Sequence, residues 1–432
     1  MRIVQITPGS GDNFYCENCL RDAALVKAMR KLGHDVLMVP LYLPLQIDKT
    51  EQLTNAPLFF GGINVYLQQK FSLFRRTPRW IDRWLDSRRL LEWAGRKAGM
   101  TSAQDLGDAT ISMLQGEDGR QVKELDRLVD WLCTETERAD VVCLSNILLA
   151  GLVHRIKERL GVPVVCLLQD EDGFLDGLTS PHAERAWGIV RERARHIDAF
   201  LAVSDYFGAV MRDRLAVSGE RVHVARMGVD VNGYTPSDAA PAQPTIGYLS
   251  RMCPSHGLDT LVDAFILLKK RKGLESAKLR ISGGRSAADE PFIERLEAKL
   301  TAAGVRGDVE FLRAFDGSDK HEFLRSLSVL SVPEPQPVAY GLYVLEALAM
   351  GVPVVEPAIG CFPETIALTG GGVLYEPNTA ERLAETLEPL LRDPRAAKQL
   401  GAHGRARLHE AFEIERTATE LVRIYERIVQ EP

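Results

Sequence analysis

Residues 340–355 read YGLYVLEALAMGVPVV, and this stretch decides how the second half of the chain folds. Gly341 allows a tight turn before a short apolar helix, and a Gly-Val-Pro break at 351–353 leads into a buried strand. At the helix start, backbone N–H groups of Gly341 and Leu342 meet the positive end of the helix dipole, which suits an anion. Glu346, about one turn further on, is placed to accept hydrogen bonds from sugar hydroxyls.

The same alternation of apolar strands and amphipathic helices occupies the rest of the second half. It predicts strands at 245–249, 278–282, 309–312, 330–332, 352–355 and 373–375. It predicts helices at 258–271, 291–303 and 320–327, and two more that begin at 380 and 394. Because a helix separates successive strands, we expect a parallel sheet with helices on both faces.

The first half of the chain repeats this pattern. Strands are expected at 2–6, 36–39, 141–144, 162–168, 199–203 and 222–225. Helices are expected at 19–32 and 183–194, and two further helices are expected to end at residues 136 and 160. Between 234 and 244 the composition becomes that of a linker, with Pro236, Pro241 and Pro244.

The predicted fold class is therefore α/β, with two tandem Rossmann-like, doubly wound parallel-sheet domains that face a cleft. We place the N-terminal domain at 1–236 and the C-terminal domain at 242–413. A last helix, at about 414–432, is expected to pack back on the N-terminal domain.

The composition is that of an ordinary globular protein, with 45% hydrophobic and 26% charged residues in 432. A net charge of -6 provides no basic surface, so we expect no nucleic-acid partner. The first apolar run is too short for a secretory signal, and no run approaches the roughly 20 apolar residues of a membrane span. These features predict a cytoplasmic location.

Residues 76–94 carry Trp80, Trp84 and Trp93 among several arginines. An Arg-rich amphipathic helix of this kind is suited to anionic lipid, which would make the protein peripheral at the membrane, or to a large acceptor. A helix that packs over the rim of the cleft explains the same residues, so both interpretations stay open.

Cys16 and Cys19 stand apart from the other cysteines, because they lie between the first strand and the first helix. Their spacing occurs in redox motifs and in half zinc sites. No second Cys/His pair with metal spacing completes a zinc site in the sequence, so no metal is expected. We interpret the two cysteines as packing residues or as part of the wall of a substrate pocket.

With both halves laid out, the chain resembles the retaining GT-B glycosyltransferases of family four, which transfer a sugar from a nucleotide diphosphate donor. In the second half, the resemblance lies in 246–251 (IGYLSR) with 256–261 (HGLDTL), 279–284 (LRISGG), the donor motif at 340–355, and 360–364 (GCFPE). In the first half, 227–230 (MGVD) and 202–204 (AVS) resemble the family's Asn-Gly-Val-Asp turn and strand-end Ser.

The resemblance implies roles for individual residues. Arg251 stands at the phosphate-binding Arg of the family and Glu346 at the Glu that holds the ribose, and both are implied in catalysis. The other residues implied on the donor side are His256, Gly341, Leu342, Gly283, Gly9 and Gly11. Those implied on the acceptor side are Gln169, Asp12, Cys16 and Cys19. Glu171 and Asp172 complete the candidate catalytic residues, as carboxylates that can act as acid or base or orient the acceptor.

Three positions depart from the family pattern. Val338 replaces the first Glu of the donor motif, although Glu334 lies one short turn upstream. His256 replaces a Lys, and because an imidazole is only partly charged near neutral pH, phosphate binding is expected to be weaker or to depend on pH. Gln169 stands where the family often has a His, and a Gln side chain cannot act as an acid or base.

The leading interpretation is an enzyme, a hexosyltransferase-like retaining glycosyltransferase that needs no metal or other cofactor. Its partners would be a nucleotide-sugar donor and a sugar, glycan or lipid-linked acceptor. The three departures keep open a degenerate, non-catalytic GT-B protein that binds nucleotide or glycan. A nucleotide-sugar epimerase of the same architecture is a further alternative.

Overall fold

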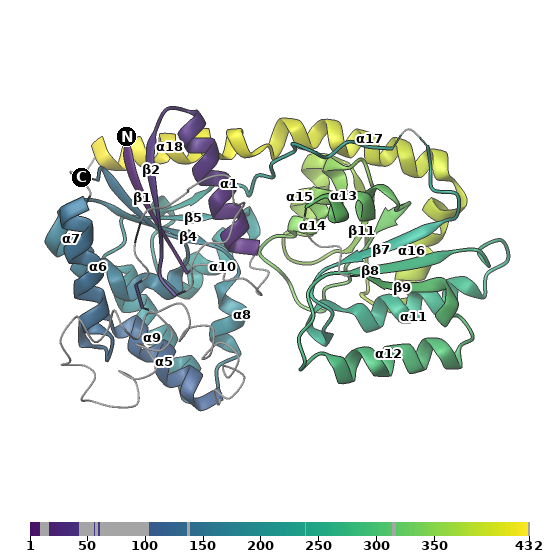
Figure 1. Cartoon of the computed structure of the whole chain (residues 1–432), viewed down its shortest axis with the longest axis horizontal. Helices are drawn as coiled ribbons and strands as arrows, with labels where there is room; N and C mark the ends of the chain where they lie inside the picture. The colour runs from purple at the N-terminus through teal and green to yellow at the C-terminus, as the bar shows by residue number, and fades with distance from the viewer. Residues whose placement is uncertain are drawn as a thin grey trace. The chain divides into compact units, whose positions relative to one another are not determined.

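The computed structural model describes residues 1–8, 17–42, 56, 59–60, 103–135, 139–237, 239–312 and 317–430 (Figure 1). Contacts divide the chain into two compact units, Met1–Arg226 with Glu415–Pro432, and Met227–Ile414. Gly9, Gly11, Asp12, Cys16 and the segment 76–94 lie outside the described residues, so the predictions made for them stay predictions. Cys19 lies in a helix, and its side chain is also outside the described part.

The first unit contains a six-stranded parallel sheet in the order β2-β1-β3-β4-β5-β6. Its strands are β1 (Arg2–Thr7), β2 (Asp35–Pro40), β3 (Val141–Leu144), β4 (Val164–Leu168), β5 (Ala199–Ala202) and β6 (Val222–Val224). Every residue of β3, β4 and β5 is buried, as expected of a sheet covered on both faces. The strand order reverses between the neighbouring strands β1 and β3. Ligands of open α/β sheets bind outside the carboxyl ends of the strands at such a point.

Helices and 3-10 turns connect these strands. They are α1 (Glu17–Lys31), α5 (Ala103–Gln115), η3 (Gly116–Asp118), α6 (Val122–Glu135), η4 (Ile147–Leu152), α7 (Val153–Leu160), α8 (Glu171–Asp176), α9 (His182–Ala194), α10 (Asp205–Leu215) and η5 (Gly219–Arg221). Local sequence explains several of their ends. Ser204 caps α10 by accepting a hydrogen bond from the Phe207 N–H, and Gly161 ends α7 in the left-handed conformation.

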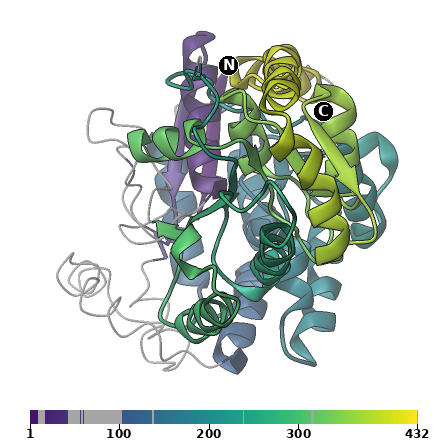
Figure 2. The same cartoon turned by 90° about the vertical axis from the view of Figure 1, so that its right-hand side faces the viewer.

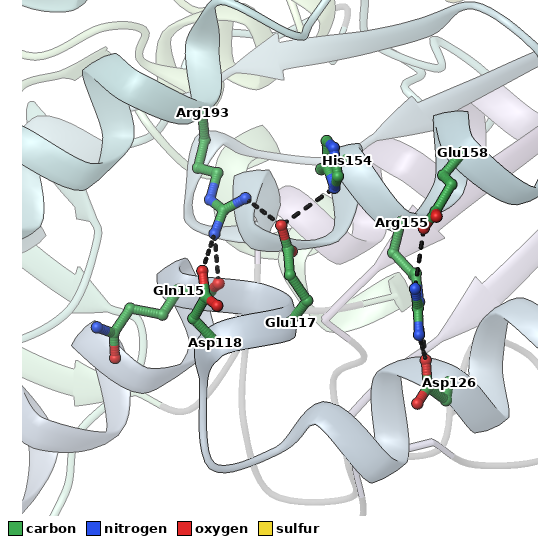
Figure 3. A network of polar contacts seen from close by, with 8 residues as sticks. All are labelled: Gln115, Glu117, Asp118, Asp126, His154, Arg155, Glu158 and Arg193. Atoms are coloured by element: carbon green, nitrogen blue, oxygen red, sulfur yellow. Dashed lines mark hydrogen bonds and ion pairs between the residues drawn. The ribbon is translucent and has the colours of Figure 1, made fainter.

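A polar network joins four of these elements in the first unit (Figure 3). Arg193 of α9 donates to the Glu117 carboxylate of η3 at 2.7 Å, and His154 of α7 lies 3.1 Å from the same carboxylate. Arg155, also in α7, contacts Asp126 of α6 at 2.9 Å. The contacts fix the packing of these helices, and none of the residues predicted for the site takes part.

The last helix, α18 (Ile414–Gln430), belongs with the first unit (Figures 1 and 2). The Tyr425 hydroxyl donates to Cys143 Sγ at 3.3 Å, and Lys31 Nζ lies 3.3 Å from Glu415 Oε1. Among the described residues, no helix combines the length and the apolar character needed to cross a bilayer.

The second unit contains another six-stranded parallel sheet, in the order β12-β11-β10-β7-β8-β9. Its strands are β7 (Thr245–Leu249), β8 (Lys278–Ser282), β9 (Val309–Leu312), β10 (Val329–Leu330), β11 (Val354–Pro357) and β12 (Gly372–Tyr375). The prediction of two parallel-sheet α/β domains is confirmed. Residues 351–353 form the turn before β11, so this strand begins later than predicted.

The α-helices of the second unit follow the predicted alternation with one addition, and two short 3-10 helices, η6 and η7, were not predicted either. They are η6 (Pro254–His256), α11 (Leu258–Lys269), α12 (Glu290–Ala302), η7 (Arg306–Asp308), α13 (Gly317–Arg325), α14 (Leu342–Ala349), α15 (Phe362–Thr369), α16 (Ala380–Arg392) and α17 (Pro394–Ala411). The short helix α15 was not predicted, because the loop motif at 360–364 carries no long apolar period.

The chain leaves the first unit after Arg226 and returns to it at Glu415. In the first unit, the Thr417 hydroxyl donates to the Arg226 carbonyl at 2.9 Å. In the second unit, the Val229 N–H donates to the Phe412 carbonyl at 2.8 Å, and Val229 forms an isolated parallel bridge with Glu413. Both ends of the second unit are therefore joined by hydrogen bonds.

Candidate functional site

Charged side chains of the second unit come from the segments that follow β7, β8, β9 and β10. They are Arg251, His256, Asp289, Lys320, Glu334 and Glu346, and the three carboxylates among them are buried, with at most 5% of each residue exposed. Because the carboxyl ends of parallel strands share one edge of the sheet, residues far apart in the sequence meet here.

Arg251 follows β7, and its guanidinium is paired with the buried Asp289 carboxylate through Nε at 3.2 Å and Nη2 at 3.1 Å. Burial alone would raise the pKa of Asp289, but hydrogen bonds from Ser286 and Arg251 lower it below its usual value. The Arg251 side chain remains 52% exposed, so the pair holds a fixed guanidinium at the protein surface. A guanidinium in this arrangement is suited to phosphate oxygens.

Gly283, at the end of β8, allows this arrangement. Its φ is +141°, and an ideal Cβ would lie 1.8 Å from the Ser250 carbonyl oxygen. Only glycine therefore fits between the two strand ends, and the Met252 N–H then donates to the Gly284 carbonyl at 2.9 Å. The Gly-Gly turn at 283–284 is therefore a point where the backbone passes close to Ser250, next to Arg251.

His256 lies at the end of η6, and its Nδ1 is 2.9 and 3.0 Å from the two carboxylate oxygens of Glu334. Glu334 also accepts a hydrogen bond from the Tyr343 hydroxyl at 3.2 Å. The family comparison from sequence pointed to Val338 as the position that lacks a carboxylate. In the structure, the nearby Glu334 carboxylate contacts the His256 ring.

Glu346 is buried in α14, and its Oε1 is held from two sides. Lys320 of α13 forms an ion pair with it, and the Tyr234 hydroxyl donates to it at 2.9 Å. Sequence reasoning missed Lys320, since nothing in the sequence of α13 indicates that this side chain would contact α14. Among the described contacts both partners use Oε1, so the second oxygen is the one suited to a ligand hydroxyl.

Gly341 and Leu342 stand at the start of α14, as predicted. No side chain caps this helix start. The preceding loop is held by the Cys361 N–H, which donates to the Val338 carbonyl at 3.1 Å, and by Gly360, where a Cβ would lie 2.6 Å from the Val338 nitrogen. The loop motif at 360–364 thus supports the donor motif at 340–355.

Gln169, Glu171 and Asp172 of the first unit follow β4. The Glu171 carboxylate accepts hydrogen bonds from the backbone N–H groups of Gln169 at 2.7 Å and Ile147 at 3.1 Å, which joins the ends of β3 and β4. Burial raises the pKa of Glu171 to about 7 despite these bonds. Asp172 is partly buried, and burial raises its pKa against the hydrogen bond of Gly173 and the charge of Arg214.

Beside Gln169 the first unit holds a group of buried polar side chains, which we call the amide cluster. Gln169 Nε2 donates to the Ser145 carbonyl and lies 3.5 Å from Asp22 Oδ1, and Asp22 is paired with Arg21 at 3.0 Å. Among the residues that the structure describes, Asp22 Oδ2, Ser145 Oγ and Gln169 Oε1 have no hydrogen-bond partner. Sequence reasoning identified Gln169 but not Asp22 or Ser145.

In the described part of the chain, no group of three or more His, Cys, Asp or Glu side chains is arranged to hold a metal ion. Among the residues predicted for donor binding, Arg251 and His256 have side chains whose chemistry suits an anion.

Two family models match successive parts of the chain. "Glycosyl transferase 4-like domain" matches residues 23–228, and "Glycosyl transferases group 1" matches residues 236–407. The chain is a glycosyltransferase of the GT-B fold. The predicted enzyme class is thereby confirmed.

Relatives of this glycosyltransferase include mycobacterial enzymes. The MMP alpha-(1->4)-mannosyltransferase of Mycolicibacterium hassiacum is 26% identical over 94% of this chain and 93% of that protein. A GDP-mannose-dependent alpha-(1-6)-phosphatidylinositol monomannoside mannosyltransferase of Mycobacterium tuberculosis is 32% identical over 53% of this chain and 63% of that protein.

Solved structures share the fold. Sucrose-phosphate synthase from Thermosynechococcus elongatus has a TM-score of 0.74 at 17% identity, and each chain is covered in full. Anabaena HepE in complex with UDP and glucose has a TM-score of 0.69 at 15% identity, with 99% of each chain covered. At these identities the similarity establishes the GT-B architecture alone.

Proposed function

We propose that this glycosyltransferase transfers a hexosyl group, with retention of configuration, from a nucleoside diphosphate sugar to a hydroxyl of a sugar, glycan or lipid-linked acceptor. The observation that carries the proposal is the Arg251–Asp289 pair, a partly exposed guanidinium fixed on a buried carboxylate at the carboxyl edge of the second sheet. The relatives named as mannosyltransferases make GDP-mannose the first donor to test.

In the proposed reaction, Arg251, His256 and the start of α14 bind the diphosphate. They stabilise the charge that develops when the bond between the anomeric carbon and the phosphate oxygen breaks. Glu346 holds the ribose hydroxyls. The acceptor oxygen bonds to the anomeric carbon on the face that the phosphate leaves, and its proton passes to the departing phosphate. The products are the glycosylated acceptor and a nucleoside diphosphate.

The acceptor is assigned to the first unit, where Gln169, Asp172 and the amide cluster offer hydrogen-bonding groups. Glu171 has a supporting role, because both carboxylate oxygens accept from backbone N–H groups. We infer that Arg251 and His256 supply the positive charge at the diphosphate and that the reaction needs no metal ion. We place the enzyme in the cytoplasm, peripheral at the membrane if its acceptor is lipid-linked.

A binding panel with GDP, UDP and ADP, followed by turnover with the matching sugar nucleotide, tests the proposal. Thermal stabilisation by one diphosphate is expected, since a ligand at about 100 times its dissociation constant adds roughly 2.7 kcal/mol to the folded state. Release of that diphosphate only when acceptor is added would support transfer. Tight binding without turnover would favour a degenerate protein, and conversion of the donor without acceptor would favour an epimerase.

A further inference from the structure

His256 and Glu334 form a pair whose geometry defines the state of the ring. An ionised carboxylate only accepts hydrogen bonds, so the Nδ1 that lies 2.9 and 3.0 Å from its oxygens carries a proton. Glu334 has 3% of its side chain exposed, whereas His256 has 33%. A buried carboxylate at this distance favours the doubly protonated, positive ring.

Glu334 is held in place at its carboxylate and at its backbone by other elements of the second unit. The Tyr343 hydroxyl of α14 donates to Oε1, and the Asn378 side chain donates to the Glu334 carbonyl at 2.8 Å. Asn378 is in turn fixed by the Tyr375 hydroxyl of β12 at 2.8 Å. Since the carboxylate is fixed, it orients the imidazole.

Gly257 brings the two partners together. Its φ is +65°, and an ideal Cβ would lie 1.9 Å from the Pro333 carbonyl oxygen. This close approach places η6 directly against the residue before Glu334. The contact between His256 and Glu334 is thus built into the backbone, although the residues are 78 positions apart in the chain.

Several other titratable groups lie near the pair in the described part of the second unit. Tyr248 of β7 donates its hydroxyl to the Arg251 and His256 carbonyls, and burial keeps its pKa well above the usual value. Burial likewise raises the pKa of Glu356 in β11. Cys253 and Asp259 flank η6 and α11, and Arg251 is already paired with Asp289.

We propose that Glu334 maintains His256 as an imidazolium and that His256 is the pH-dependent cation of the donor diphosphate site, with Tyr343 as a second positioning residue. The inference rests on the proposed function. It gives the Glu334 carboxylate a role that differs from that of the missing carboxylate at Val338, because Glu334 pairs with the His256 ring. The charged imidazole then takes the place of the permanently charged ammonium of a lysine. Donor affinity in this enzyme therefore falls as pH rises above the range in which the ring is protonated.

The test compares His256→Lys with the wild type, using GDP as the probe and UDP in parallel. Dissociation constants are measured by calorimetry from pH 5.5 to 8.5. Because the terminal phosphate of the probe also titrates near this range, the ratio of the two constants is the readout, and the ligand's own titration cancels. We expect the wild type to lose about tenfold in affinity relative to His256→Lys between pH 6 and 8.5.

Glu334→Gln supplies the second arm, with Glu310→Gln, an exposed carboxylate on β9, as its control. The Hε1 proton resonance of His256 should titrate at lower pH in Glu334→Gln than in wild type, and be unchanged in Glu310→Gln. A flat affinity ratio, or an unchanged resonance, would overturn the inference. If neither wild type nor His256→Lys binds any diphosphate, the proposed function fails instead. The His256→Lys arm remains informative if Glu334→Gln does not fold.

Discussion

The polar groups at the carboxyl edges of the two sheets are paired in different ways. In the second unit, the buried carboxylates of Asp289, Glu334 and Glu346 each contact a basic side chain, whereas that of Glu356 accepts from the Val332 N–H. In the first unit, the amide cluster contains buried oxygen atoms without a partner among the described residues. Unpartnered buried polar atoms imply water or a ligand group. The difference teaches that the second unit mostly pairs its buried carboxylates with basic side chains, whereas the first unit leaves several buried oxygen atoms for water or a ligand group.

Loss of a cation in the second unit should have the largest effect on stability. Lys320→Met would leave the Glu346 carboxylate buried without its counter-charge, because only 13% and 5% of the two side chains are exposed. We expect the free energy of unfolding to fall by about 3–5 kcal/mol in urea titrations. Lys278→Met, which breaks a more exposed pair with Asp308, should cost less than about 1 kcal/mol. Equal costs would show that burial does not determine how much each ion pair contributes to the free energy of unfolding.

In the first unit, Glu171→Gln tests a buried carboxyl without a cation. Its pKa of about 7 in the folded state exceeds the usual value, so the folded state binds more protons than the unfolded state between pH 4.5 and 7. Wild-type stability should therefore fall by about 3 kcal/mol relative to Glu171→Gln as pH rises through this window.

Chemical denaturation at pH 4.5, 6 and 8 measures this difference. Glu158→Gln, at an exposed carboxylate of α7, is the control and should follow the wild type at every pH. Parallel curves for wild type and Glu171→Gln would refute the assignment of a strained, buried carboxyl to the first unit.

Arg251→Ala tests whether the guanidinium that Asp289 holds in place binds the donor diphosphate. If the guanidinium binds the diphosphate, GDP affinity should fall about 100-fold, which corresponds to about 2.8 kcal/mol. Arg280→Ala removes another Arg–carboxylate pair of the same unit, on β8 and β9, and should leave affinity unchanged. A similar loss in both variants would point to a general effect of charge or stability.

The smallest effect on stability is expected for two buried serines, one in each unit, that differ in whether the hydroxyl has a hydrogen-bond partner. Ser331 and Ser145 are both fully buried, but the Ser331 hydroxyl donates to the Val355 carbonyl at 2.6 Å, whereas Ser145 Oγ has no partner among the described residues. Ser331→Ala should cost about 1–2 kcal/mol and Ser145→Ala less than about 0.5 kcal/mol. A larger cost at Ser145, measured by thermal unfolding, would reveal a bound water or an undescribed partner.

The fold was largely predictable because parallel strands buried on both faces appear as short apolar runs, as at β3 and β4. Helix α8 was missed, since six residues are too few for a helical period to show. Glu346 and Arg251 could be identified by resemblance to family motifs. Their partners could not, because Lys320 lies on α13 and Asp289 in the turn before α12, and the order of strands in the sheet is not encoded in apolar periodicity.

The hydrogen-bonded ends of the second unit have a consequence for protein engineering. Val229 and Glu413 lie side by side, and Thr417 contacts Arg226 where the chain re-enters the first unit. Codons 227–414 therefore encode one continuous cassette whose two junctions are already aligned. Segments with neighbouring ends tolerate insertion, exchange and circular permutation. Replacement of this single cassette by that of a related enzyme is thus the most direct route to a chimera with a different donor.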